Sequence, residues 1–151
     1  MVDRFERFSF ALSELSRYWH KITADEMEAY GLKGPHSVYL TAMYRYPDGI
    51  TAPQLCALCG KDKSDVSRTM SLMEQKGLVR KEGGYQNRYG GVFKLTEKGR
   101  AAAEQVRRRA SLAVQIAGED LSDENRAVFY ESLEKIVSKL RDISKEGLPQ
   151  E

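Results

Sequence analysis

Apolar residues near the start of the chain recur at alternating intervals of three and four positions, from Phe5 to Ile22. The last part of the chain repeats this spacing from Phe129 to Ile143. Intervals of three and four place side chains on one face of an α-helix. The pattern therefore predicts two long amphipathic helices, each with an apolar stripe that needs another helical surface to cover it.

Between these stripes, the apolar pattern predicts two shorter helices, at 52–59 and at about 62–76. Thr51 supplies a hydroxyl that caps the start of the first helix. The second helix carries three apolar residues on one face, which we expect to pack against Leu55 and Leu58 of the first. These three residues are Val66, Met70 and Met73.

The opposite face of the second helix is polar. It carries short hydroxyl side chains and long cations, the residue types that hydrogen-bond phosphates and base edges when a helix lies in the major groove of DNA. A solvated surface is the alternative interpretation of such a face. The residues predicted to contact DNA from this helix are Lys63, Ser64, Ser67, Arg68 and Ser71.

Two short strands are predicted next, at 78–81 and 92–95, on either side of a glycine-rich segment. Arg88 lies near the middle of this segment, where an arginine can enter a minor groove or pair with a phosphate. Helix, turn, helix and hairpin in this order predict a winged helix-turn-helix over 49–96. We therefore expect a mainly α fold with a small β-hairpin wing, flanked by N- and C-terminal dimerisation helices.

A further helix is predicted from its cap Thr96 to about Ala117, and Ser122 is predicted to cap the last helix. Segments 3–46 and 97–145 would then form a helical frame, with the whole chain of 151 residues as a single domain. The residues expected to face inward from the helix that starts after Thr96 are Ala102, Val106, Ala110, Ala113 and Ile116.

The frame is expected to hold two copies of the chain together. A helix-turn-helix reader gains specificity from two copies placed one DNA turn apart, roughly 34 to 36 Å, and terminal helices that pair across a two-fold axis fix that spacing. Packing of the terminal helices against each other within one chain is the alternative. The residues predicted to form the dimer contact are Phe5, Phe8, Leu12, Leu15, Trp19, Leu133, Ile136 and Leu140.

Charge is unevenly distributed behind a formal net charge of +2. Residues 61–109 hold 13 Lys and Arg against 6 Asp and Glu, and the remainder is acidic. A cationic surface supplies the sequence-independent part of DNA affinity through release of counterions. The basic block includes Arg107, Arg108 and Arg109, for which contact with the DNA backbone and a solvated helix surface are both open.

The segment 54–81, followed by Leu-Thr-Glu-Lys-Gly-Arg at 95–100, resembles the MarR family of bacterial transcriptional regulators. The shared features are a Lys-Ser-x-Val-Ser-Arg helix, a Lys-Gly-Leu-Val exit and a Leu-Thr-Glu-Lys-Gly return from the wing. The resemblance implies a symmetric dimer that reads a pseudo-palindromic operator with the second helix in the major groove and the wing in the minor groove. It places Ser64, Ser67 and Arg68 where the family contacts DNA.

The wing departs from the family pattern. That pattern has Asp-x-Arg, with the arginine in the minor groove and the aspartate holding it, whereas the equivalent positions here are Asn87, Arg88 and Tyr89. Asn87 and Arg88 therefore join the predicted DNA contacts, with Arg88 in the arginine's role. A wing that binds DNA more weakly is the alternative.

The resemblance also implies release of DNA by a small aromatic effector, bound where the frame meets the DNA-reading region. Aromatic and titratable residues on the first helix and on the helix after Gly34 are the candidates for that pocket. Each is as readily a core or a surface residue. The candidates are Tyr18, His20, His36, Tyr39 and Met43.

Cys56 and Cys59 form a C-x-x-C pair within the first central helix. Two thiols three residues apart lie on the same side of a helix, which suggests redox sensing or metal binding. The sequence offers no second pair or His-x-x-His to complete four ligands, so neither a metal nor another cofactor is predicted. A small buried hydrophobic residue is the alternative role for each cysteine.

The sequence contains none of the short motifs of hydrolase, nucleotide-binding or metallopeptidase sites, so we expect no enzymatic activity. Apolar runs fall short of the ~20 residues of a membrane span, and charges follow the first residues, so no membrane partner and a cytoplasmic location are expected. The competing function is a winged-helix module that binds a protein. Tyr85 and Tyr89 favour that function, and the basic block opposes it.

Overall fold

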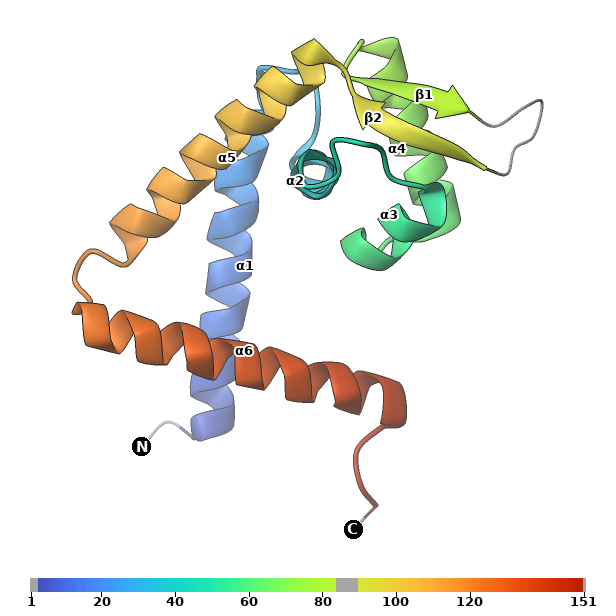
Figure 1. The fold of residues 1–151 in the computed structure, drawn as a ribbon. Coiled ribbons are helices and arrows are strands. Elements are labelled where there is room, and N and C mark those ends of the chain that lie inside the picture. The colour runs from blue at the N-terminus through green and yellow to red at the C-terminus, as the bar shows by residue number, and fades with distance from the viewer. Residues whose placement is uncertain (1–2, 84–89, 151) are drawn as a thin grey trace. The chain divides into compact units, whose positions relative to one another are not determined.

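The computed structural model describes residues 3–83 and 90–150, and most of them lie in helices (Figure 1). The chain divides into two compact units, Met1–Ser111 and Leu112–Glu151. The predicted fold class, mainly α with a small antiparallel hairpin, is confirmed, whereas the single-domain expectation stays a prediction. In chain order the elements are α1 (Arg4–Glu28), the 3₁₀ helix η1 (Gly34–His36), α2 (Ser37–Tyr44), α3 (Ala52–Cys59), α4 (Lys63–Gln75), β1 (Val79–Gly83), β2 (Gly91–Leu95), α5 (Glu97–Ala117) and α6 (Asp123–Glu146).

The core of the first unit forms around α2, which Figure 1 shows nearly end-on. Tyr39 and Met43 of α2 are buried in one apolar cluster with Leu55 of α3, Met70 of α4 and Val106 of α5. The helix also packs against α3 and β2. Since burial of such side chains stabilises each by roughly 1.5–3 kcal/mol, the core around α2 contributes strongly to the stability of this unit.

Helical spacing predicted the buried face of α4 correctly and that of α3 in part. Leu55 is fully buried, but Leu58 is 48% exposed, so its predicted packing against α4 is wrong. The inward face of α3 is centred on Leu55 and Cys59, with Cys56 also against the core, and Leu58 lies to one side of it. The apolar residues of α4 that are buried as predicted are Val66, Met70 and Met73.

The hairpin is an antiparallel pair in which Val79 of β1 lies opposite Leu95 of β2. Each strand begins within one residue of its predicted start. Ile50 exchanges two backbone hydrogen bonds with Phe93, at 3.0 and 2.8 Å. The hairpin is therefore tied directly to the segment that enters α3.

The start of α5 is joined to the end of α4. Thr96 acts as the predicted cap, because its Oγ1 accepts the Gly99 N–H at 3.0 Å. The same hydroxyl donates to the Gly77 carbonyl oxygen at 2.6 Å. Gly99 approaches the chain so closely that an added Cβ would overlap the Leu78 carbonyl oxygen, which explains the need for glycine there. The first turn of α5 and the entry to β1 form one packed joint.

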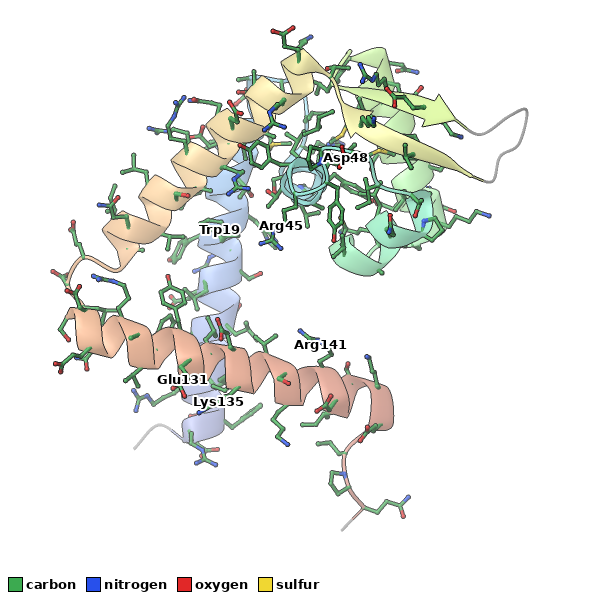
Figure 2. The ribbon with its side chains drawn as sticks, viewed as in Figure 1. Trp19, Arg45, Asp48, Glu131, Lys135 and Arg141 are labelled. Carbon is green, nitrogen blue, oxygen red and sulfur yellow. The ribbon has the colours of Figure 1, made fainter. Side chains whose placement is uncertain are left out.

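In the second unit, α6 begins at its predicted cap, where Ser122 Oγ accepts the Asn125 N–H at 3.1 Å. Glu131 and Lys135, both labelled in Figure 2, form an ion pair of 2.7 Å along it. Ile116, near the end of α5, is 55% exposed, so its predicted inward position is wrong for the single chain. The apolar stripe of α6 is exposed in the single chain and comprises Phe129, Leu133, Ile136, Leu140 and Ile143.

The predicted stripe on α1 is exposed in the same way, and Trp19, labelled in Figure 2, belongs to it. The buried residues of α1 are Thr23 and Met27, near its C-terminal end. Both terminal helices thus form as predicted, with stripes that are exposed in the single chain. None of the described helices combines the length and apolar character needed to cross a membrane.

Candidate nucleic-acid interface

The first helix of the helix-turn-helix is closed at both ends by local hydrogen bonds. Thr51 Oγ1 accepts the Gln54 N–H at 3.3 Å, and Gln54 Oε1 accepts the Thr51 N–H at 3.0 Å. This reciprocal capping fixes the start of α3. Gly60 ends the helix with φ 62°, a left-handed conformation that glycine adopts without steric cost. The chain then turns within three residues into α4.

The second helix presents its polar face to solvent. Asp62 caps α4, because its Oδ1 accepts the Asp65 N–H at 2.7 Å. All the residues of α4 that we predicted to contact DNA are exposed, as expected from their spacing. They are Lys63, Ser64, Ser67, Arg68 and Ser71. The other two predicted contacts, Asn87 and Arg88, lie outside the described residues.

The base of the hairpin brings two cations around one carboxylate. Glu82 lies 2.8 Å from the Arg80 guanidinium and 2.8 Å from the Lys94 ammonium. The hydrogen bond from Lys94 is the largest cause that lowers the pKa of Glu82. Lys81 points the other way, with its ammonium 5.6 Å from the centre of the Phe93 ring. These positions were missed from the sequence, although Arg80 and Glu82 two residues apart on a strand share a face.

A groove of about 680 Å³ separates the hairpin from the two helices of the helix-turn-helix. Most of its lining is apolar, and Lys63, Ser67 and Lys81 add polar groups to it. The concave face therefore combines the first turn of α4 with the base of the wing. Its remaining lining residues are Thr51, Ala52, Pro53, Cys56, Val66, Gly90, Gly91 and Phe93.

Tyr39 connects the core to the first turn of α4. Its side chain is fully buried, and its hydroxyl donates a short hydrogen bond to Asp65 Oδ1. Burial and this bond raise the pKa of Tyr39, and the bond from Tyr39 is the main cause that lowers the pKa of Asp65. Thr69 Oγ1 donates to the same carboxylate oxygen at 3.4 Å. Asp65 is thus held by two neutral hydroxyls.

The predicted effector residues are not brought together in this groove. Tyr18 and His20 are exposed on α1, and Tyr39 and Met43 are core residues. Tyr39 and Met43, which the sequence suggests as pocket residues, therefore have a packing role in the single chain. His36 is half-buried, its Nδ1 accepts the Lys33 N–H at 3.0 Å, and burial lowers its pKa. The effector pocket stays a prediction.

The two cysteines are free and half-buried. Cys59 Sγ lies 3.9 Å from the Val38 carbonyl oxygen, and burial raises the pKa of its thiol. A raised pKa reduces the thiolate fraction and with it the reactivity. Among residues 3–83 and 90–150, no group of three or more His, Cys, Asp or Glu side chains is placed to hold a metal ion.

The three consecutive arginines of α5 make contacts within the protein. The Arg107 guanidinium lies 4.4 Å from the centre of the Tyr44 ring, which is a cation–π arrangement. Arg109 Nε lies 3.1 Å from Glu26 Oε1, and Arg108 contacts Gln105. These contacts support a structural role for Arg107 and Arg109 between α5 and its neighbours.

The helix pair, its capped second helix and the hairpin define a winged helix-turn-helix protein. The family model described as MarR family matches residues 30–88, which include α2, α3, α4 and β1. Over this segment the chain is similar to the MarR family of transcriptional regulators, and a likeness to regulators agrees with the expectation of no enzymatic activity. No curated protein matches the chain significantly.

Solved structures share this fold over nearly the whole chain. A MarR transcriptional regulator from Methanosarcina mazei Go1 is 24% identical with a TM-score of 0.81, covering 95% of this chain and 94% of that one. A putative MarR family regulator from Listeria monocytogenes, solved with 26mer DNA, is 19% identical with a TM-score of 0.79, covering 100% and 99%. CouR from Rhodococcus jostii RHA1, bound to p-coumaroyl-CoA, is 20% identical with a TM-score of 0.72, covering 85% and 90%. At these identities the likeness establishes the fold.

Proposed function

We propose that the chain is a sequence-specific regulator of transcription that binds double-stranded DNA as a homodimer on a pseudo-palindromic operator. The observation that carries this proposal is the exposed face of α4, which presents Ser64, Ser67 and Arg68 beside the cationic base of the hairpin. Hydroxyls and cations on a helix of this kind suit contacts to phosphates and base edges. The related fold solved with 26mer DNA supports the same use of the fold.

The homodimer is the part of the proposal that the terminal helices support. The stripes of α1 and α6 each expose large apolar side chains in the single chain. Contiguous apolar surface of this kind marks an interaction site in a folded protein. A two-fold pair would present two copies of α4 to successive major grooves, roughly 34 to 36 Å apart. A cytoplasmic location belongs to this proposal, because that is where bacterial operators lie.

Repression and release by an effector complete the proposal. A dimer seated on an operator within a promoter would exclude other proteins from that DNA, which favours a repressor. CouR, with the same fold, was solved with p-coumaroyl-CoA, and this supports a small aromatic effector for the present chain. The pocket proposed for it is bordered by the exposed Tyr18 and His20 of α1 and by His36, where a second copy of the chain would complete the walls.

Selection from a random-sequence duplex pool, repeated across a salt series, tests the function. We expect enrichment of a two-fold symmetric site, with affinity that falls steeply with salt as for roughly 6 to 10 phosphate contacts. Arg68→Glu should remove both specific and nonspecific duplex binding. Lys135→Glu on α6, the same change of charge on another surface, is the matched control. A protein that enriches no sequence would instead favour the winged-helix module that binds a protein.

A further inference from the structure

The carboxylate of Asp65 occupies an unusual place for a helix proposed to face DNA. Asp65 lies in the first turn of α4, next to exposed Ser64 and one turn before Arg68. A carboxylate turned toward phosphates would repel them, since like charges at close range are unfavourable. The position of this side chain therefore matters for any nucleic acid that approaches the start of α4.

The structure holds this carboxylate toward the core. Asp65 is half-buried, while its neighbours Ser64 and Ser67 are exposed. Its Oδ1 accepts a hydrogen bond from the hydroxyl of Tyr39, whose side chain is 0% exposed. The same atom accepts a second hydrogen bond from the Thr69 hydroxyl at 3.4 Å. A buried phenol hydroxyl needs an acceptor, and a carboxylate is a stronger one than a neutral group. The two groups therefore fix each other in a single orientation.

The hydrogen bond between Tyr39 and Asp65 also joins two different helices, α2 and α4. Tyr39 belongs to α2, and Asp65 to α4, twenty-six positions further along the chain. The preceding η1 packs against α1, where Gly34 fits against the backbone of Ala24. Tyr39 thus connects the start of α4 to the helices that α2 is packed on.

We propose that Tyr39 is a positioning residue for DNA reading, which holds the Asp65 carboxylate toward the core and so keeps a second carboxylate, besides that of the exposed cap Asp62, away from phosphates at the start of α4. This inference rests on the proposed function. Tyr39 itself does not contact DNA in this proposal, because its side chain is fully buried. Loss of its hydroxyl frees the carboxylate to turn outward.

The test measures affinity for the selected duplex in wild type, Tyr39→Phe, Asp65→Asn and the double variant. Tyr39→Phe should bind about tenfold more weakly, in line with the loss of one hydrogen bond to a charged group. Asp65→Asn should bind at least as well as wild type, because its amide oxygen still accepts from Tyr39 and the charge is gone. In the double variant, loss of the hydroxyl should cost less than about threefold relative to Asp65→Asn. Tyr46→Phe, at an exposed tyrosine, is the control.

A second measurement needs no DNA. The midpoint of the Asp65 carboxyl titration, followed by NMR, should shift to higher pH in Tyr39→Phe and stay unchanged in Tyr46→Phe. If Tyr39→Phe does not fold, Asp65→Glu replaces it, because the longer side chain keeps the charge and loses the position, and it should weaken binding by a similar factor.

Each other result overturns the inference. Equal affinity of Tyr39→Phe and wild type would show that the bond does not matter for reading, as would equal affinity of Asp65→Glu and wild type. An equal loss in both backgrounds would show that Tyr39 acts through something other than the charge of Asp65. An unshifted titration would show that Tyr39 does not hold the carboxylate. If the wild type itself enriches no duplex, the proposed function fails first, and the inference about DNA falls with it.

Discussion

The carboxylate of Glu82 on β1 and the ammonium of Lys94 on β2 are 2.8 Å apart across the hairpin. They occupy diagonal positions, because Lys94 lies directly opposite Arg80 and Glu82 opposite Val92. Arg80 and Lys94 would repel each other as a directly opposed pair of cations. Glu82 therefore allows two cations to stand side by side at the base of the wing, and it also offsets part of their charge.

Glu82→Gln should strengthen nonspecific duplex binding and steepen its dependence on salt. Without the carboxylate, Arg80 and Lys94 are available for phosphates, so the slope of log affinity against log salt should grow by about one to two in magnitude. Fluorescence anisotropy of a labelled duplex across a salt series measures this slope. Glu28→Gln, at an exposed carboxylate at the end of α1, is the matched control. An unchanged slope would show that the wing base does not approach the backbone.

Asp65 should make the stability of the fold depend on acid. Its pKa is lowered from the ordinary 3.8, chiefly by the hydrogen bond from Tyr39. A lowered folded-state pKa gives stability that is present above the ordinary value and is lost as the pH falls through the folded value. The free energy of unfolding should thus drop more from about pH 5 to about pH 3 in wild type than in Asp65→Asn. Urea titrations at both pH values measure the difference, and equal drops would contradict it.

Gly99→Ala should destabilise the protein by more than about 2 kcal/mol, because the new methyl overlaps the Leu78 carbonyl oxygen and both backbones must shift. Gly118→Ala is the matched control, since its nearest neighbour, the Val114 carbonyl oxygen, would be 3.5 Å from the added Cβ. Thermal or urea unfolding distinguishes the two. A Gly99→Ala variant as stable as the control would mean that the joint between α5 and β1 is looser than the structure indicates.

The native Cys59 thiol should react slowly. Its raised pKa leaves little thiolate at neutral pH, so iodoacetamide should modify it more slowly than a free thiol. Cys56→Ser isolates the reaction of Cys59, and urea should restore the ordinary rate. Mass spectrometry of quenched samples follows the modification. Rapid alkylation of Cys59 in the folded protein would revive the redox hypothesis.

Leu133→Lys should convert the proposed dimer to monomer. A charge placed in the α6 stripe, where Leu133 is 39% exposed in the single chain, would have to be buried without a partner in a dimer contact. Ser138→Lys adds the same charge on another face of α6 and should leave the dimer intact. Sedimentation velocity reports both states. Equal sedimentation of the two variants would exclude Leu133 from the contact.

Much of the fold could be predicted from the sequence because it is set by neighbours in the chain. The caps Thr51, Thr96 and Ser122 act over three residues, and the buried face of α4 follows from its own spacing. The same locality explains why all five predicted contacts on α4 are exposed. Expectations of this kind depend on helical geometry alone.

The parts that were missed depend on pairs of distant elements. Whether Leu58 is buried depends on which side of α3 meets α2, and a helix of eight residues offers too few turns to settle this from spacing. The partners of Glu82 and Tyr39 come from across the hairpin and from another helix. Tyr39 in particular looked like an aromatic pocket residue, since its type and position do not reveal that its hydroxyl is used by Asp65.

The joint at Thr96 limits how the wing can move. One hydroxyl bonds to both Gly77 and Gly99, and Gly99 leaves no space against Leu78. A hinge needs residues whose backbone angles can change freely, and these contacts restrict the backbone at Gly77 and Gly99. We therefore expect the first turn of α5 and the two strands of the hairpin to move as one rigid body. A tilt imposed on the first part of α5 would therefore also reorient β1 and β2.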